Sequence, residues 1–209
     1  GTLSPATTQI GSFYRMCQGP KRDGEVGVVE LYEEDLVRDR AGAETTIRIA
    51  AERVGNAAND ARGTAMDGGA RATVQHFLMG FDGCGQTDGA AGTLFAFGLA
   101  RQCQAVADYV DLILEHFVHH PPNGGVARLK VNVVGLSRGG IAAMFLCQLL
   151  SGTAARPATE LTSKAEDLPP SRRYDPSFLS IHALLFDPVP GNLVSTAKAF
   201  DCFRFFVAN

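Results

Sequence analysis

The chain has 209 residues, of which 45% are hydrophobic and 20% charged, and its formal net charge is −3. That length fits a single domain able to bury a substantial core, and the composition is ordinary for a globular protein. The slightly negative charge, with its scattered basic residues, excludes a broad electrostatic surface for nucleic acid.

The first third of the sequence predicts one strand and one helix. Residues 1–23 are polar and rich in turn formers, so we expect a loop or loosely attached arm there. Residues 25–32 have the β-branched content of a strand, and apolar residues recur at helical spacing over 44–61. A glycine-rich connection follows, so residues 1–72 are interpreted as an arm plus the first strand and helix of the same domain.

From residue 73 onward, strand and helix patterns alternate. We expect strands at 73–81, 128–134 and 178–186 and helices at 98–118 and 139–150. Buried strands alternating with helices are typical of a mostly parallel sheet flanked by helices, so the predicted fold class is α/β, with 73–209 as its core. The three strands are expected to be neighbours whose C-terminal ends converge on one crevice.

Two segments depart from this pattern. Residues 151–176 are polar, charged and proline-bearing, which predicts a solvated surface loop; a lid over an active-site mouth is the functional alternative. Residues 199–209 resemble a helix end running into a last strand. Because a sheet that ends there has no closing helix, we expect the fold to be incomplete at the C-terminus.

No membrane or secretion signal is visible. The longest apolar stretch, residues 141–150, is about half of the roughly 20 residues that a membrane span requires. The first eleven residues lack the charged start and apolar middle of a signal peptide. These observations predict a cytoplasmic location.

The cysteines give no support for a metal or redox site. They are odd in number and widely spaced, and no two form a CxxC pair, so neither a metal nor a cofactor is predicted. Two of them lie in apolar helical patterns, where buried, reduced thiols are expected, and this favours a reducing compartment. The five are Cys17, Cys84, Cys103, Cys147 and Cys202.

The most informative motif is Gly135-Leu136-Ser137-Arg138-Gly139. It directly follows a β-branched strand and opens an apolar helix, as a nucleophile elbow requires. We expect Gly135 and Gly139 to lack Cβ atoms because neighbouring backbone passes closely, and Ser137 to present its hydroxyl at a helix N-terminus. The alternatives are a glycine-rich turn without chemistry and a phosphate-binding turn.

An acid follows at the end of the next predicted strand. Asp187 closes the run 178–186, where a carboxylate would lie in the crevice that open α/β sheets use for binding. In a hydrolase triad this acid orients the histidine, and the chain order of serine before acid is the expected one. Alternatively, Asp187 only begins a proline-containing turn.

An oxyanion hole needs backbone N–H groups beside the nucleophile. Arg138, the residue after the serine, is expected to supply one N–H, and the glycine-rich turn at 80–85 a second one from Gly83 or Cys84. An ordinary tight turn or a phosphate cradle is the alternative interpretation of that loop. Cys84 itself has no elbow around it and is not expected to be a nucleophile.

Together these motifs resemble the α/β-hydrolase domain of bacterial lipase effectors of the type VI secretion class. In that group an Arg follows the serine of the elbow, as Arg138 follows Ser137, and an Asp-Gly turn matches Asp82-Gly83. The resemblance covers about residues 73–190 and implies a serine esterase, lipase or phospholipase acting through an acyl-serine intermediate. It also implies a small-molecule or lipid ester as substrate, with transient membrane-surface contact, and secretion into a reducing compartment as the alternative location.

The family pattern requires a histidine after the acid, and this chain has none beyond Asp187. Three explanations stay open: the sequence stops short of the native C-terminus, His119 or His120 reaches the site through an unusual topology, or the protein does not turn over. His182 lies in the strand that carries Asp187, which is poor geometry for a triad. The alternative function is therefore a catalytically inactive binding module on a hydrolase fold.

Overall fold

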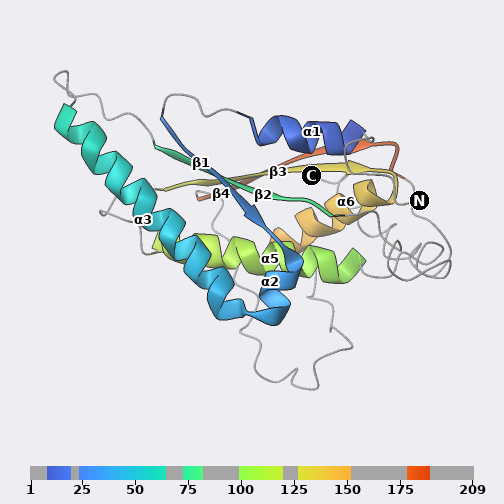
Figure 1. Cartoon of the computed structure of the whole chain (residues 1–209). Coiled ribbons are helices and arrows are strands. Elements are labelled where there is room, and N and C mark those ends of the chain that lie inside the picture. The colour runs from blue at the N-terminus through green and yellow to red at the C-terminus, as the bar shows by residue number, and fades with distance from the viewer. Residues whose placement is uncertain are drawn as a thin grey trace. The chain divides into compact units, whose positions relative to one another are not determined.

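The computed structural model describes residues 9–19, 24–64, 73–81, 99–119, 127–151 and 178–188 (Figure 1). The chain divides into two compact units, one made of residues 1–80 and 110–127 and the other of residues 81–109 and 128–209. Three features predicted from the sequence lie outside the described residues: the turn at 82–85, the segment 152–176 and the final strand at 199–209.

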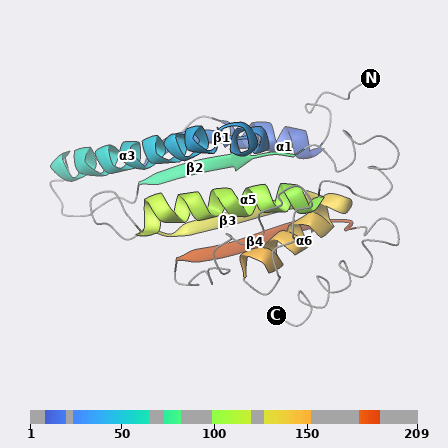
Figure 2. The same ribbon diagram turned by 90° about the horizontal axis from the view of Figure 1, so that it is seen from below.

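The first unit is built on a parallel pair of strands. Strand β1 (Glu25–Leu31) pairs with β2 (Val74–Met79), and helix α3 (Arg40–Thr64) runs along the pair (Figure 2). The helix begins earlier than expected because the Asp39 carboxylate accepts a hydrogen bond from the Gly42 N–H at 2.9 Å, which satisfies one of the free N–H groups of the first turn. Ala43, Ile47 and Ala50 recur on its buried face.

Two further helices of this unit were not expected. Residues 9–17 form helix α1 (Gln9–Cys17) where the sequence predicted a loop, and α2 (Glu33–Arg38) follows β1. The prediction of a loop was wrong because Ile10, Phe13, Tyr14 and Cys17 have helical spacing, which the polar residues around them obscured. The Tyr14 ring lies against Gly80, where an added Cβ would meet it at 2.8 Å.

The second unit is also built on a parallel pair. Strand β3 (Leu129–Leu136) pairs with β4 (Leu179–Phe186) without a register shift, from Leu129 opposite Leu179 to Leu136 opposite Phe186. Helix α6 (Arg138–Leu150) follows β3 immediately and lies beside the pair (Figure 1). Leu150 is fully buried, and α6 buries residues on most of its circumference, which is typical of a helix enclosed by other parts of a core.

Helix α5 (Leu99–Leu114) begins in the second unit and continues into the first. In the second unit, the Cys103 thiol donates a hydrogen bond to the Ala142 carbonyl of α6 at 3.3 Å. In the first, a π-helical turn (Glu115–His119) extends α5, and the Phe117 ring packs edge-to-face on Phe77 of β2, with ring centroids 5.6 Å apart. Such aromatic pairs stabilise packing beyond the area that they bury.

The protein is thus a mixed α/β structure with parallel strand pairs and helices, which confirms the coarse fold class. The described strands form two two-stranded sheets, and β2 is paired with β1. The sequence predicted that residues 74–81 and 129–134 form neighbouring strands. The described strands do not contain this pairing. Within the described residues, no helix is both long enough and apolar enough to cross a membrane.

Candidate functional site

The register of the β3–β4 pair brings the predicted serine and acid to the same edge. Leu136 lies opposite Phe186, so Ser137 and Asp187 are the next residues as the chain leaves two adjacent parallel strands. The Ser137 N–H donates a hydrogen bond to the Phe186 carbonyl at 2.9 Å. The strand ends are therefore joined directly at the position where the elbow begins.

Ser137 has a strained backbone. Its φ is 54° and its ψ is −121°, in a region that residues with a Cβ rarely adopt, at a cost of about 1–3 kcal/mol. Ser137 is the N-cap residue of α6, yet its side chain makes no capping hydrogen bond. The hydroxyl of a serine at an N-cap normally accepts a hydrogen bond from an N–H of the first turn. The Ser137 hydroxyl does not have this capping role.

The glycines around Ser137 differ in whether a side chain would fit at their positions. A Cβ on Gly135 would lie 2.3 Å from the Gly139 carbonyl oxygen and 2.7 Å from the Gly140 nitrogen, so only glycine fits there. Among the described residues outside its own helix turn, a Cβ on Gly139 would meet no atom within 4 Å, so the close approach expected at Gly139 is not found there. The close approach is at Gly140, where a Cβ would lie 2.9 Å from the Pro188 Cβ.

Asp187 directly follows β4 and is exposed, with a φ of 43°. Aspartate tolerates the left-handed region better than most residues because its short polar side chain can bond locally. Among the residues that the structure describes, Ser137 and Asp187 are the two non-glycine residues with positive φ. Strain is thus concentrated at the shared edge of β3 and β4.

The Arg138 N–H, which the sequence predicted as the first oxyanion donor, lies at the N-terminus of α6. Arg138 is the first residue of the helix, where backbone N–H groups have no intrahelical acceptor and the helix dipole favours negative charge. The Gly140 N–H donates to the Ser137 carbonyl at 2.9 Å and is therefore not available to an oxyanion. The second predicted donor, from Gly83 or Cys84, lies outside the described residues and stays a prediction.

No described histidine of the second unit lies beside Ser137 and Asp187. His182 is opposite Asn132 in the register of β4, and five residues of strand place it about 16 Å from Asp187. In the first unit, His76 lies 3.2 Å from Glu25 and His116 lies 3.7 Å from Glu44. The side chains of His119 and His120 are outside the described part of the chain, so the general base is not assigned.

The described cysteines are thiols that form no disulfide. Cys17 is exposed, whereas Cys103 and Cys147 are buried, as the sequence predicted for these two. Burial raises the pKa of the Cys147 thiol to about 11, so it stays protonated and unreactive at neutral pH. No group of three His, Cys, Asp or Glu side chains suited to a metal ion occurs in the described ranges.

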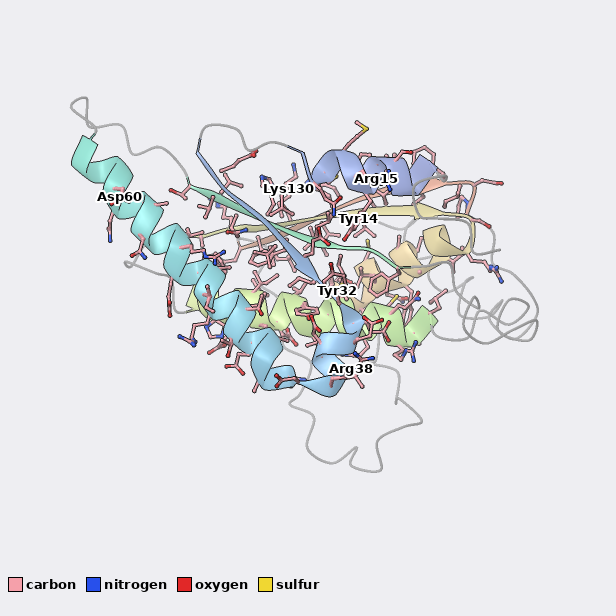
Figure 3. The ribbon with its side chains drawn as sticks, in the orientation of Figure 1. Tyr14, Arg15, Tyr32, Arg38, Asp60 and Lys130 are labelled. Carbon is pink, nitrogen blue, oxygen red and sulfur yellow. The ribbon has the colours of Figure 1, made fainter. Side chains whose placement is uncertain are left out.

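A second polar cluster, at the end of β1, was not found from the sequence. The Glu30 carboxylate accepts hydrogen bonds from the Tyr32 hydroxyl and the Gln18 amide, each at 2.5 Å. The hydrogen bond to Glu30 raises the pKa of Tyr32 to about 12. Burial, then the charge and hydrogen bonding of Glu30, also raise the pKa of Tyr14. Tyr14 comes from α1 and Tyr32 from the end of β1 (Figure 3), so the cluster joins these elements.

Comparison of the chain with known protein families, with curated proteins and with solved structures gives no significant match.

Proposed function

We propose that the protein is a serine hydrolase of the α/β-hydrolase class, which cleaves a carboxylic ester through an acyl-Ser137 intermediate. The observation that carries the proposal is the backbone of Ser137, with φ 54° and ψ −121° in a sharp turn from β3 to α6. A nucleophile elbow has this arrangement, because the strained turn lifts the hydroxyl to the top of the sheet.

The two alternative interpretations of the glycine-rich turn account for less of the geometry. A phosphate-binding turn uses backbone N–H groups at a helix N-terminus and needs no strained residue with a side chain. A turn without chemistry would be relieved by glycine at position 137. A serine that bears strain and does not cap its helix is explained by a role for its hydroxyl.

In the proposed reaction, the Ser137 Oγ attacks the ester carbonyl and loses its proton to a general base. The Arg138 N–H then stabilises the negative charge that develops on the carbonyl oxygen. The alcohol leaves with that proton, and water hydrolyses the acyl-enzyme by the same route. Asp187 would orient the base and stabilise its imidazolium form. Its place at the end of the strand next to β3 supports this role.

The proposed substrate is a small-molecule or lipid ester, and the proposed site of action is a reducing compartment. The buried, reduced thiols of Cys103 and Cys147 support the reducing compartment, since disulfides are rare where thiols are kept reduced. Hydrolysis of p-nitrophenyl esters from acetyl to palmitoyl would distinguish an esterase from a lipase by the chain length with the highest kcat/KM.

The test of the function is labelling by a fluorophosphonate probe, carried out on the protein with its native ends. Wild-type protein should be labelled at Ser137, as mapped by mass spectrometry. Ser137→Ala should remove the label, whereas Ser151→Ala, at the other end of α6, should keep it. If the wild-type protein is not labelled and cleaves no acyl ester, the proposal fails in favour of a non-catalytic binding module.

A further inference from the structure

Three contacts connect the neighbours of the proposed triad acid in the sequence to the start of α6. The Ser137 N–H donates to the Phe186 carbonyl and the Gly140 N–H donates to the Ser137 carbonyl, both at 2.9 Å. The third contact is the approach of Gly140 to Pro188, where the missing Cβ would lie 2.9 Å from the Pro188 Cβ and 3.2 Å from its Cα. We call Phe186, Ser137, Gly140 and Pro188 the strand-end bracket.

The bracket holds Asp187 from both sides in the sequence. Phe186, before the acid, is bonded to the serine itself, and Pro188, after it, lies against the first turn of the helix that the serine opens. Proline fixes its own φ near −65°, so the chain leaves Asp187 in a restricted direction. The positive φ of Asp187, 43°, is thus maintained by contacts on either side.

Glycine at position 140 sets how closely the two strand ends approach. Carbon atoms in good contact lie about 3.5–4.0 Å apart, so a methyl group on residue 140 would push Pro188 away by up to about 1 Å. Displacement of a reacting group by about 1 Å costs on the order of 100-fold in rate. Among the described residues, Gly139 has no such constraint, since a methyl group there meets no atom within 4 Å outside its own helix turn.

We propose that Gly140 and Pro188 are positioning residues, which act through Asp187 by holding its carboxylate in register with Ser137. The proposal rests on the proposed function, because it assigns Asp187 as the triad acid. It differs from the sequence-based expectation, which placed close approaches at Gly135 and Gly139 and treated Pro188 only as part of a possible turn after Asp187.

The test compares fluorophosphonate labelling rates among matched variants. Gly140→Ala should slow labelling by about 10–100-fold, while Gly139→Ala, with the same added methyl group one residue earlier, should change it by less than about threefold. Removing the opposing Cβ in Gly140→Ala/Pro188→Gly should leave a smaller loss than Gly140→Ala alone, since the two changes share one contact. In the Asp187→Asn background, Gly140→Ala should not slow labelling further, because the carboxylate that it displaces is already absent. A purely structural defect would slow labelling in addition to the effect of Asp187→Asn.

Amide hydrogen exchange gives a second readout that does not need activity. The Ser137 N–H should be protected in the wild type and in Gly139→Ala, and should exchange at least about tenfold faster in Gly140→Ala. If Gly140→Ala does not fold, Pro188→Gly alone opens the bracket without adding an atom to α6, and it should also slow labelling.

The outcomes separate the two proposals. A labelled wild type with equal rates in Gly140→Ala and Gly139→Ala would overturn the positioning role and leave the hydrolase function standing. Additive losses in the Asp187→Asn background would likewise overturn it. An unlabelled wild type would overturn the function and the positioning role together, even if the exchange data showed that the bracket contacts exist.

Discussion

The ends of the two parallel strand pairs are built in opposite ways. At the end of β3 and β4, Ser137 and Asp187 both have positive φ. At the end of β1, Tyr32 has relaxed extended backbone, with φ −123° and ψ 139°. Each of Ser137 and Tyr32 is the N-cap of the following helix, and neither side chain caps it. The Tyr32 hydroxyl is bonded to Glu30 at 2.5 Å instead.

The contrast supports the proposal that the end of β3 and β4 is functional, whereas the end of β1 is structural. Around Glu30, the Gln18 amide and the Tyr32 hydroxyl each donate to one carboxylate oxygen, and this arrangement joins the end of α1 to β1. Neither donor residue has a positive φ. Around Ser137, strain is retained although a glycine would relieve it. Strained residues persist only where the surrounding contacts hold them, and they cluster at functional sites. This is why we place the chemistry at β3 and β4.

The largest expected effect is on the rate of ester hydrolysis, which should depend on the acid at the end of β4 and not on the acid in β1. Asp187→Asn should slow ester hydrolysis by about 10³–10⁴-fold, because the amide cannot stabilise an imidazolium ion. Asparagine tolerates positive φ as aspartate does, so the melting temperature should hardly change. Glu30→Gln, at the end of β1, should leave kcat/KM within about twofold. Equal losses in the two variants, measured by steady-state kinetics, would erase the distinction between the strand ends.

Two glycine substitutions, one at each strand pair, should lower the free energy of unfolding by different amounts. Gly135→Ala places a Cβ 2.3 Å from backbone, whereas Gly80→Ala, just after β2, places one 2.8 Å from the Tyr14 ring. Backbone inside a packed turn cannot yield, so we expect about 3 kcal/mol or more of destabilisation for Gly135→Ala. The Tyr14 side chain can move aside, so Gly80→Ala should cost below about 1 kcal/mol. Urea unfolding measures both, and a reversed order would contradict the described packing.

Replacement of the strained serine should stabilise the protein. Ser137→Gly removes about 1–3 kcal/mol of backbone strain and adds about 0.5–1 kcal/mol of chain entropy in the unfolded state, which leaves a net gain of about 1 kcal/mol. Activity should be lost at the same time, a trade-off typical of functional sites. The control is Ser151→Gly at the C-cap of α6, where φ is −74°; it should be slightly destabilising. A stability loss in Ser137→Gly by urea unfolding would show that the serine is not strained.

The smallest effect is the titration of Tyr32. Its pKa is raised from 10.0 to about 12 by the hydrogen bond to Glu30, so the bond stabilises the folded state below pH 10 and is lost as the pH rises through 12. Phenolate absorbance between pH 9 and 13 should show this late titration in wild type and an earlier one in Glu30→Gln. Tyr32→Phe identifies the signal. An unshifted titration in wild type would remove the structural role given to the β1 end.

The sequence predicted the described elements well where hydrophobic periodicity was strong. The segments containing β1 to β4 and helices α3, α5 and α6 were all expected, with boundaries shifted by a few residues. Helix α1 was missed because polar and turn-forming residues dominate the segment 1–23 that contains it. The partner of β2 was also missed, since strand pairing depends on contacts between distant segments that periodicity does not encode.

For the candidate site, the sequence by itself determined that a serine and an acid follow two successive strands in the second half of the chain, although these strands are less buried than it predicted. Strand ends and turn residues are local properties, and the residues Gly135 to Gly139 and Asp187-Pro188 display them directly. Only the tertiary structure decided that β3 and β4 are adjacent in unshifted parallel register, that Ser137 is strained and uncapped, and that Gly140 rather than Gly139 meets its neighbour at Pro188. These features depend on distances between segments about 50 residues apart in the chain, and such distances are fixed by packing, which no local pattern of residues specifies.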